Sequence, residues 1–458
     1  MSVIKHASLM IAASLGVKVL SLLSQVVMGY YLAPEIFGIY AASLGLAAYL
    51  SWMQNAASLQ YLLKQQIDSS VRGIYWIAMM FNGLSGVAMF ALASTQESSE
   101  VAFITSCFAI VQLTGICQLY IRAEYTKKSA FGAYAAYEFL ASFLRSGTLI
   151  LGAIFIANAY VFGISALIVV LFELCIALVM IRGREYSFVV PRLADLKLDM
   201  SQIKWLLLGG IGSVATMQGV FLAVGHSQSN VDLGYFFFSY QLVGVFSLLI
   251  GEASRKVLMP HVASMSADGQ KSEFVLKTIR LMMSVMVPIS IFTAFFIDDL
   301  VNVVWQGKWA QTKIMTELLG LSFYAPVIVQ LCYSGMEASG FWKKRNIYQL
   351  LDGLSLVLVV LYASIYLSLQ DVVLVIAVRR MFAFILISVL SFRKLNISIR
   401  DCAGMASFAV LSTVLGYLLL NFLWWQQLLY VVAVFLIFVF VFEFAFYRKL
   451  FLRFVKND

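Results

Sequence analysis

The chain has 458 residues, of which 62% are hydrophobic and 12% charged, and its formal net charge is +9. A soluble globular protein has about 25% charged residues, and one water-exposed fold could not bury this much apolar surface. The composition therefore excludes a soluble globular protein and predicts an all-α polytopic membrane protein. Helices satisfy their own backbone hydrogen bonds in lipid, and the sequence shows no alternating pattern of barrel strands.

Long apolar segments predict about 14 transmembrane helices, because a span needs about 20 apolar residues. In chain order, the segments cover residues 7–32, 37–62, 74–94, 101–121, 131–157, 160–181, 203–226, 233–258, 276–297, 315–338, 347–368, 372–392, 403–422 and 427–447. The first segment is too long for a signal peptide and carries Lys18 in its middle, so we interpret it as a permanent span.

Basic residues are strongly biased to one side of the membrane. If the N-terminus is cytoplasmic, the 32 Lys and Arg residues lie on the cytoplasmic side, apart from Lys308, Lys313 and those inside the apolar segments. This bias follows the positive-inside rule and predicts that both termini are cytoplasmic. A missing span would move every later loop to the other side. Because topology accounts for the positive charge, we predict no nucleic-acid partner.

A hydrophilic stretch after the sixth span predicts a division into two halves. The predicted domains are an N-terminal lobe (1–182), a cytoplasmic linker (183–202), a C-terminal lobe (203–394), and two extra helices with a basic tail (395–458). A short repeat supports this division, since Phe37–Tyr40 opens the second span and Leu233–Phe236 opens the eighth. Both halves start on the same side, which predicts parallel, pseudo-symmetric bundles of about six helices each.

Cations inside the spans are the first candidates for a binding site. They are Lys18, Arg145, Arg379 and Arg380. A charge in hydrocarbon is costly and is usually functional, so we predict a cationic cavity between the lobes that binds an anionic group. Arginine binds phosphate through a bidentate fork and lysine as a point charge, which makes pyrophosphate a natural ligand. Alternatively, these cations pair with acidic residues and hold helices together, for example Lys18 with Glu138 or Arg380 with Asp352.

Acidic residues inside the spans are candidates for ion coupling or for pairing. Glu138, Glu173 and Glu252 are candidates to bind a coupling Na⁺ or H⁺, and Asp352 is a candidate partner for an arginine. The five cysteines form no CxxC pair and the histidines are far apart, so we expect no metal site. No P-loop motif is present, and we expect neither a cofactor nor enzymatic activity.

Aromatic residues and prolines at the spans suggest structural roles. Trp305 and Trp309 flank Lys308 at an outer boundary, which predicts interfacial anchoring, and Trp424 with Trp425 suggests the same. The aromatic run from Tyr235 to Phe238 predicts lipid-facing or packing surface. Pro288 and Pro326 predict bends within spans, which are either static kinks or hinges used in transport.

Two stretches of the sequence resemble the polysaccharide transporter family, which comprises flippases for O-antigen and capsule repeat units. Residues 22–65, with a Pro-Glu-x-Phe-Gly turn at Pro34–Gly38, are similar to the opening hairpin of that family. Residues 303–346, with the motif Trp-Gln-Gly-Lys-Trp, are similar to the segment after its ninth span. One departure is Gln54-Asn55, where relatives often place a charged residue. The family shares a superfamily (MOP) with multidrug extruders (MATE) and the lipid II flippase.

The resemblance implies a multi-pass protein of the bacterial inner membrane. It implies movement of undecaprenyl-pyrophosphate-linked oligosaccharide from the cytoplasmic to the periplasmic leaflet by alternating access, driven by an ion gradient of H⁺ or Na⁺. The implied partners are the lipid bilayer, a polysaccharide polymerase and a chain-length regulator.

Two other functions remain open from the sequence. The first is a MATE-like drug or metabolite antiporter of the same fold, which would favour acidic residues for cationic drugs, whereas the charges near mid-span here lean basic. The second is a membrane enzyme of the same pathway. Such an enzyme would be expected to carry a sizeable outer loop with reactive groups, and the predicted outer loops are short.

Overall fold

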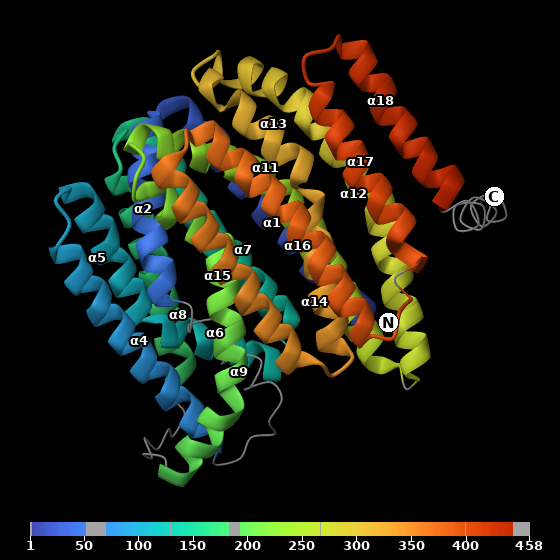
Figure 1. Cartoon of the computed structure of the whole chain (residues 1–458). Coiled ribbons are helices and arrows are strands. Elements are labelled where there is room, and N and C mark those ends of the chain that lie inside the picture. Colours follow the sequence, from blue (N-terminus) through green and yellow to red (C-terminus); the bar gives the residue numbers. More distant parts are fainter. Residues whose placement is uncertain are drawn as a thin grey trace. The chain divides into compact units, whose positions relative to one another are not determined.

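The computed structural model describes residues 2–51, 70–128, 130–182, 193–265, 267–398 and 400–442. Every regular element in these ranges is a helix (Figure 1), which confirms the predicted all-α fold. The predicted departure at Gln54-Asn55, residues 183–192 of the predicted linker and the C-terminal tail lie outside the described residues.

The helices follow one another with short connections. They are α1 (Ser2–Tyr31), α2 (Pro34–Ser51), α4 (Ser70–Ser94), α5 (Ser99–Leu113), α6 (Gly115–Lys127), α7 (Phe131–Phe155), α8 (Tyr160–Ile181), α9 (Leu193–Met217), α10 (Gly219–Gly225), α11 (Asn230–Ser264), α12 (Asp268–Trp305), η1 (Ala310–Thr312), α13 (Lys313–Ser322), α14 (Tyr324–Ala338), α15 (Trp342–Tyr366), α16 (Leu369–Lys394), α17 (Arg400–Leu418), α18 (Trp424–Ile437) and η2 (Phe438–Phe442).

These helices carry the predicted spans. Within the described residues, 6 helices are long and apolar enough to cross a membrane, or 8 spans if each of two bent helix pairs counts as one. Shorter apolar helices cover Pro34–Ala48, Ala78–Ser94, Ala403–Leu418 and Trp424–Phe440. Together with α1 and α11, they match the predicted set of about 14 spans in order. The chain is a multi-pass membrane protein.

Several spans are interrupted rather than continuous. α5 and α6 meet at an angle of 44°, and α9 and α10 meet at 51°. At the first break, the Thr114 hydroxyl donates to the Ile110 carbonyl at 2.8 Å, a local bond that competes with helix propagation. In the tenth span, α13 ends at Ser322, and Pro326 stands in the first turn of α14, where its missing N–H costs little. The fourth and tenth spans are equivalent in the predicted repeat, and both are interrupted.

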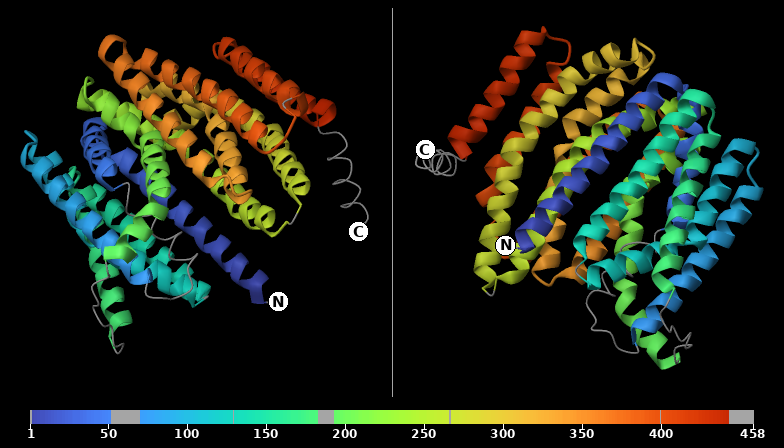
Figure 2. Two further views of the ribbon diagram at one scale, coloured as in Figure 1. Left: turned by 60° about the horizontal axis from the view of Figure 1, so that its bottom comes forward. Right: turned by 180° about the vertical axis from the view of Figure 1, so that it is seen from behind.

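The chain divides into two compact units. Unit 1 contains Met1–Phe237 and Gln349–Leu361, and unit 2 contains Phe238–Tyr348 and Tyr362–Asp458. In unit 1, α1 packs along α7, and α4 packs along α5. In unit 2, the C-terminal helices α17 and α18 (red in Figure 2) pack against α12. α9 begins inside the predicted linker, and the predicted lobe boundaries stay a prediction.

Two glycines bring the start of α2 against the start of α11 within unit 1. A Cβ atom on Gly38 would lie 1.7 Å from the Asn230 carbonyl oxygen, and one on Gly234 would lie 1.8 Å from the Pro34 carbonyl oxygen. Gly38 therefore contacts the α11 backbone one turn before Gly234, and Gly234 contacts the α2 backbone one turn before Gly38. These are the glycines of the short repeat noted in the sequence. Small residues let membrane helices approach this closely, and only glycine, which lacks a Cβ atom, fits at these two positions.

Trp305 and Trp309 do not anchor the chain at the membrane surface, so that prediction is wrong. Both side chains are buried in unit 2, at 3% and 0% exposure. Trp309 stacks on Phe238 with a centroid distance of 3.9 Å, and Trp305 meets the same ring edge-on at 5.0 Å. A tryptophan pair that encloses a phenylalanine buries more apolar area in protein than at an interface. Burial also lowers the pKa of Lys308 between them.

We expect Trp309→Phe to destabilise unit 2 by about 1–2 kcal/mol, because the smaller ring leaves a cavity beside Phe238. The measurement is the midpoint of thermal unfolding of the purified protein. The matched control is Trp424→Phe, since Trp424 is 65% exposed and its replacement should leave the midpoint unchanged. Equal effects of the two substitutions would contradict the buried stack.

Candidate functional site

Lys18 and Arg145 lie on neighbouring helices of unit 1. Lys18 is half-buried on α1, and Arg145 is exposed from α7, the helix along which α1 packs. Arg145 donates to the Tyr40 hydroxyl at 3.5 Å and forms no ion pair with any described residue. Its charge is therefore not neutralised by a carboxylate in the described part of the chain. A cation held in this way on an apolar span remains able to bind an anion.

An aromatic cluster holds Tyr40 in place beside Arg145. The Tyr40 ring stacks on Phe162 with a centroid distance of 3.9 Å and an interplanar angle of 13°. Phe237 meets Tyr40 edge-on at 5.5 Å. Phe162 and Phe237 are themselves buried. Packing on two sides fixes the position of the phenol, so the hydroxyl that orients Arg145 belongs to a rigid surface.

Arg379 and Arg380 lie on α16 in unit 2. The Arg380 guanidinium carbon lies 4.9 Å from the centre of the Tyr240 ring, and its Nη1 donates to the Ser322 hydroxyl at 3.5 Å. Both of these partners are neutral, so the contacts orient the cation without cancelling its charge. Arg379 is half-buried. The predicted cavity would combine these arginines with Lys18 and Arg145 of the other unit, and it stays a prediction.

Glu138 and Glu173 belong to one polar cluster in unit 1. Glu138 of α7 forms an ion pair with Arg122 of α6 at 3.2 Å. Glu173 of α8 is 7% exposed, and its Oε1 accepts hydrogen bonds from the Tyr137 hydroxyl at 2.8 Å and from Gln118 Nε2 at 3.0 Å. The cluster connects three helices. A buried carboxylate is tolerated where hydrogen bonds replace the water that it loses.

Several members of this cluster were not predicted. The predicted fourth span ends at residue 121, which places Arg122 in a loop, yet α6 continues through Arg122 to Lys127. Gln118 and Tyr137 were not singled out, although Tyr137 directly precedes Glu138. In unit 2, Glu317 of α13 is 8% exposed and is also absent from the predicted site residues. The sequence signal for Glu317 is its position as an acidic residue inside the predicted span 315–338.

Asp352 and Glu252 are the other two acidic candidates. Asp352 of α15 is buried in unit 1. Its neighbour Gly353 contacts α9, since a Cβ atom there would lie 2.3 Å from the Gly212 carbonyl oxygen. The suggested partner Arg380 belongs to unit 2, so this pairing stays a prediction. Glu252 lies on α11, but its side chain is outside the described residues. Among described residues, no group of His, Cys, Asp and Glu has the arrangement of a metal site.

Comparison with known proteins identifies the family. The family model described as "Polysaccharide biosynthesis protein" matches residues 27–314. The chain belongs to this family. This match confirms the family resemblance; it covers residues 27–65 of the first stretch and residues 303–314 of the second. The comparison with curated protein sequences gives no match.

Solved structures share the fold of this polysaccharide biosynthesis protein. The lipid II flippase MurJ in an inward closed conformation has a TM-score of 0.67 at 16% identity, and the alignment covers 97% of this chain and 99% of that one. A multidrug resistance MATE transporter of the MOP superfamily, inward-facing, has a TM-score of 0.56 at 15% identity, with 83% and 94% coverage. An outward-facing structure of a MATE family transporter gives 0.52 at 17% identity, with 85% and 94% coverage. These likenesses show that the chain has the helical fold of MurJ and of MATE transporters, as the family resemblance implies.

Proposed function

We propose that the protein is a flippase for undecaprenyl-pyrophosphate-linked oligosaccharide repeat units of O-antigen or capsule. It moves them from the cytoplasmic to the periplasmic leaflet of the bacterial inner membrane. The family match and the fold support a transporter of this class. The observation that carries the proposal is Arg145, a cation on an apolar span that has a tyrosine hydroxyl as its hydrogen-bond partner and no ion pair in the described residues.

The pyrophosphate of the substrate suits such a cation. A guanidinium offers parallel N–H donors to two phosphate oxygens, and the attraction is strong where water is scarce. Lys18 on the adjacent helix adds a second positive charge, and Arg379 and Arg380 would supply the other side of a cavity. The sugar portion needs neutral hydrogen-bond partners, and the hydroxyl of the half-buried Tyr40 beside Arg145 is one.

Transport would proceed by alternating access, with the two lobes opening the cavity to one side at a time. An H⁺ or Na⁺ gradient would drive the cycle, with Glu138, Glu173, Glu252 and Asp352 as candidate coupling groups. The flipped unit would then reach a polymerase and a chain-length regulator. The function involves no covalent chemistry and no cofactor, so the protein is not an enzyme in this proposal.

A strain that lacks the gene tests the function directly. We expect surface polysaccharide to disappear, lipid-linked repeat units to accumulate facing the cytoplasm, and complementation to restore display. Unchanged surface polymer would contradict the flippase proposal. In that case the alternative function, a drug or metabolite antiporter of the same fold, would take its place, and drug accumulation in the same strain would test it.

Arg145→Ala and Lys18→Ala should each reduce transport about tenfold, as expected when one charge-assisted contact to substrate is lost. The measurement is the amount of surface polymer at matched protein levels in the membrane. Arg145→Lys keeps the charge and should retain part of the activity. Lys277→Ala is the control, because Lys277 is exposed and pairs with Glu273 one turn away. Normal transport in both alanine variants would show that the cationic cavity is wrong.

A further inference from the structure

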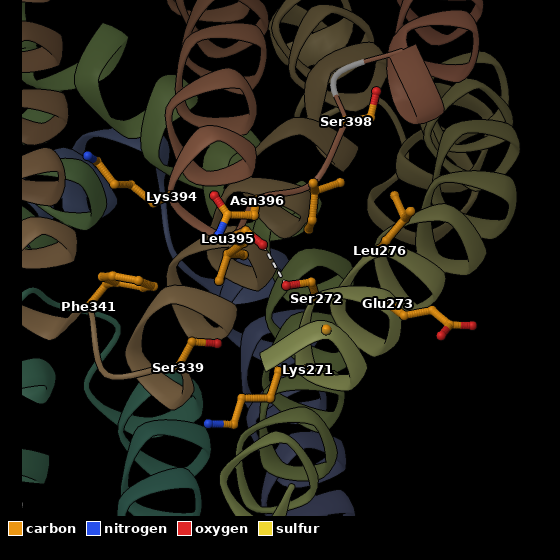
Figure 3. A pocket seen from close by; sticks show the side chains of 12 residues that line it. Lys271, Ser272, Glu273, Leu276, Ser339, Phe341, Lys394, Leu395, Asn396 and Ser398 are labelled. Atoms are coloured by element: carbon orange, nitrogen blue, oxygen red, sulfur yellow. Dashed lines mark hydrogen bonds between the residues drawn. The ribbon is translucent and has the colours of Figure 1, made fainter. Parts of the chain in front are cut away.

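A pocket of about 450 Å³ lies at one end of unit 2 (Figure 3). Its wall is formed by the first turns of α12, the connection between α14 and α15, and the connection between α16 and α17. We call it the basic pocket and define it by Lys271, Ser272, Ser339, Lys394 and Asn396, which line it. Small-molecule sites in proteins have volumes of about 300–1,000 Å³, so the pocket has room for a phosphorylated headgroup.

Hydrogen bonding fixes the rim of the basic pocket. The Ser272 hydroxyl donates to the Leu395 carbonyl at 2.5 Å, a bond drawn at the centre of Figure 3. It ties α12 to the residue that follows α16. Asn396 then adopts a left-handed conformation with φ 53°, which ends the helix and turns the chain toward α17. The pocket is therefore built by contacts between elements that are distant in the sequence.

The charge of the basic pocket is positive. Lys271 and Lys394 both line it, and Lys344 of α15 lies beside Lys394. The one carboxylate on its rim, Glu273, points away from both lysines in Figure 3 and pairs with Lys277 at 2.6 Å. The ammonium groups of Lys344 and Lys394 are neighbours and repel each other, and an anion bound beside Lys394 would reduce that repulsion.

A neutral donor in the basic pocket also lacks a partner. The Ser339 hydroxyl is buried and has no hydrogen-bond partner among the described residues. An unsatisfied buried hydroxyl is unfavourable, and a ligand oxygen would satisfy it. Lysines and hydroxyls together are donors suited to phosphate oxygens.

We propose that the basic pocket binds the phosphate group of an anionic lipid headgroup. Its residues lie where two apolar spans end, Gly269–Trp305 and Leu369–Lys394, which is the depth of a headgroup. Both ends are on the predicted cytoplasmic side. Leu276, which also lines the pocket, gives it an apolar surface on which the glycerol and upper acyl chain can rest. Basic pockets between helices on this side of a membrane bind anionic headgroups in general.

Lipid titration of the full-length purified protein tests the proposal. Phosphatidylglycerol, phosphatidylcholine or inorganic phosphate is added to the protein in detergent, and thermal stability at each concentration gives an apparent Kd. The pocket variant is Lys271→Gln with Lys394→Gln. The matched control is Lys128→Gln with Lys204→Gln, which removes two exposed lysines of unit 1. Ser339→Val is a milder second variant, in case the first one folds poorly.

We expect phosphatidylglycerol to stabilise the wild type and phosphatidylcholine to have little effect. The pocket variant should weaken phosphatidylglycerol binding about tenfold more than the control, which reports general attraction to anionic lipid. Ser339→Val should weaken it by a smaller factor. Equal weakening in the pocket variant and the control would overturn the site. If inorganic phosphate stabilises as strongly as phosphatidylglycerol, the lipid source of the phosphate is wrong.

Discussion

Replacing Gly38 or Gly234 by leucine is expected to separate α2 from α11 and to lower the yield of folded protein sharply. A Cβ atom at either position would lie less than 2 Å from a backbone carbonyl oxygen, and a backbone atom cannot rotate away. The helices must therefore move apart and lose the packing around the contact. We expect a loss of more than about 3 kcal/mol in the free energy of unfolding, above the usual cost of overpacking.

The measurement is the thermal unfolding midpoint of detergent-purified protein at a fixed scan rate, because membrane proteins often unfold irreversibly. Gly83→Leu is the matched control, since Gly83 is also a helical glycine of unit 1 and, apart from its own helix backbone, no atom lies within 4 Å of a Cβ placed there. A Gly38→Leu variant as heat-resistant as Gly83→Leu would show that α2 and α11 do not touch there.

A double alanine variant gives a further test of the same contact. Gly38→Ala and Gly234→Ala should each destabilise the protein, but their combined cost should be less than the sum of the two. One displacement of α2 from α11 relieves both clashes, so the second substitution finds the helices already apart. Full additivity would place the two glycines in separate contacts.

The sequence predicted the spans because apolar length and charge bias are local properties of the chain. The helix breaks were harder to predict. The fourth span bends at Thr114-Gly115, which contains no proline, and the sequence offered one weak signal in the glycine. Pro288, for which the sequence predicts a bend, lies inside α12 without interrupting it, and the bend itself stays a prediction. The missing N–H of a proline weakens a helix, but packing decides whether the helix breaks.

The candidate site could be predicted only in part. Intramembrane charges stand out in an apolar sequence, so Arg145 and Glu173 were found. Their partners were not, because partners are set by helix packing. Glu173 accepts from Tyr137, which is 36 residues away, and from Gln118, which is 55 residues away. Trp309 was misassigned for the same reason, since its position between spans matched a surface anchor and its stacking on Phe238 depends on α11.

Glu173→Leu is expected to destabilise unit 1 by about 2–6 kcal/mol, because each of two buried neutral donors left without an acceptor costs about 1–3 kcal/mol. The substitution leaves the Tyr137 hydroxyl and the Gln118 amide without their acceptor. Cys175→Leu is the control on the same helix, because Cys175 is exposed and its replacement should change the stability by less than about 0.5 kcal/mol. The measurement is again the midpoint of thermal unfolding.

Two further variants separate structure from ion coupling at Glu173. Tyr137→Phe removes one donor, and in the Glu173→Leu background it should cost little or nothing, because the hydroxyl no longer has an acceptor. Glu173→Gln keeps the shape and an acceptor oxygen but cannot carry a proton or bind a cation as a carboxylate does. If Glu173 couples transport to an ion, this variant should lose transport while it stays folded. If the cluster only joins α6, α7 and α8, transport and stability should fall together across the series, and Glu173 would then be excluded as a coupling group.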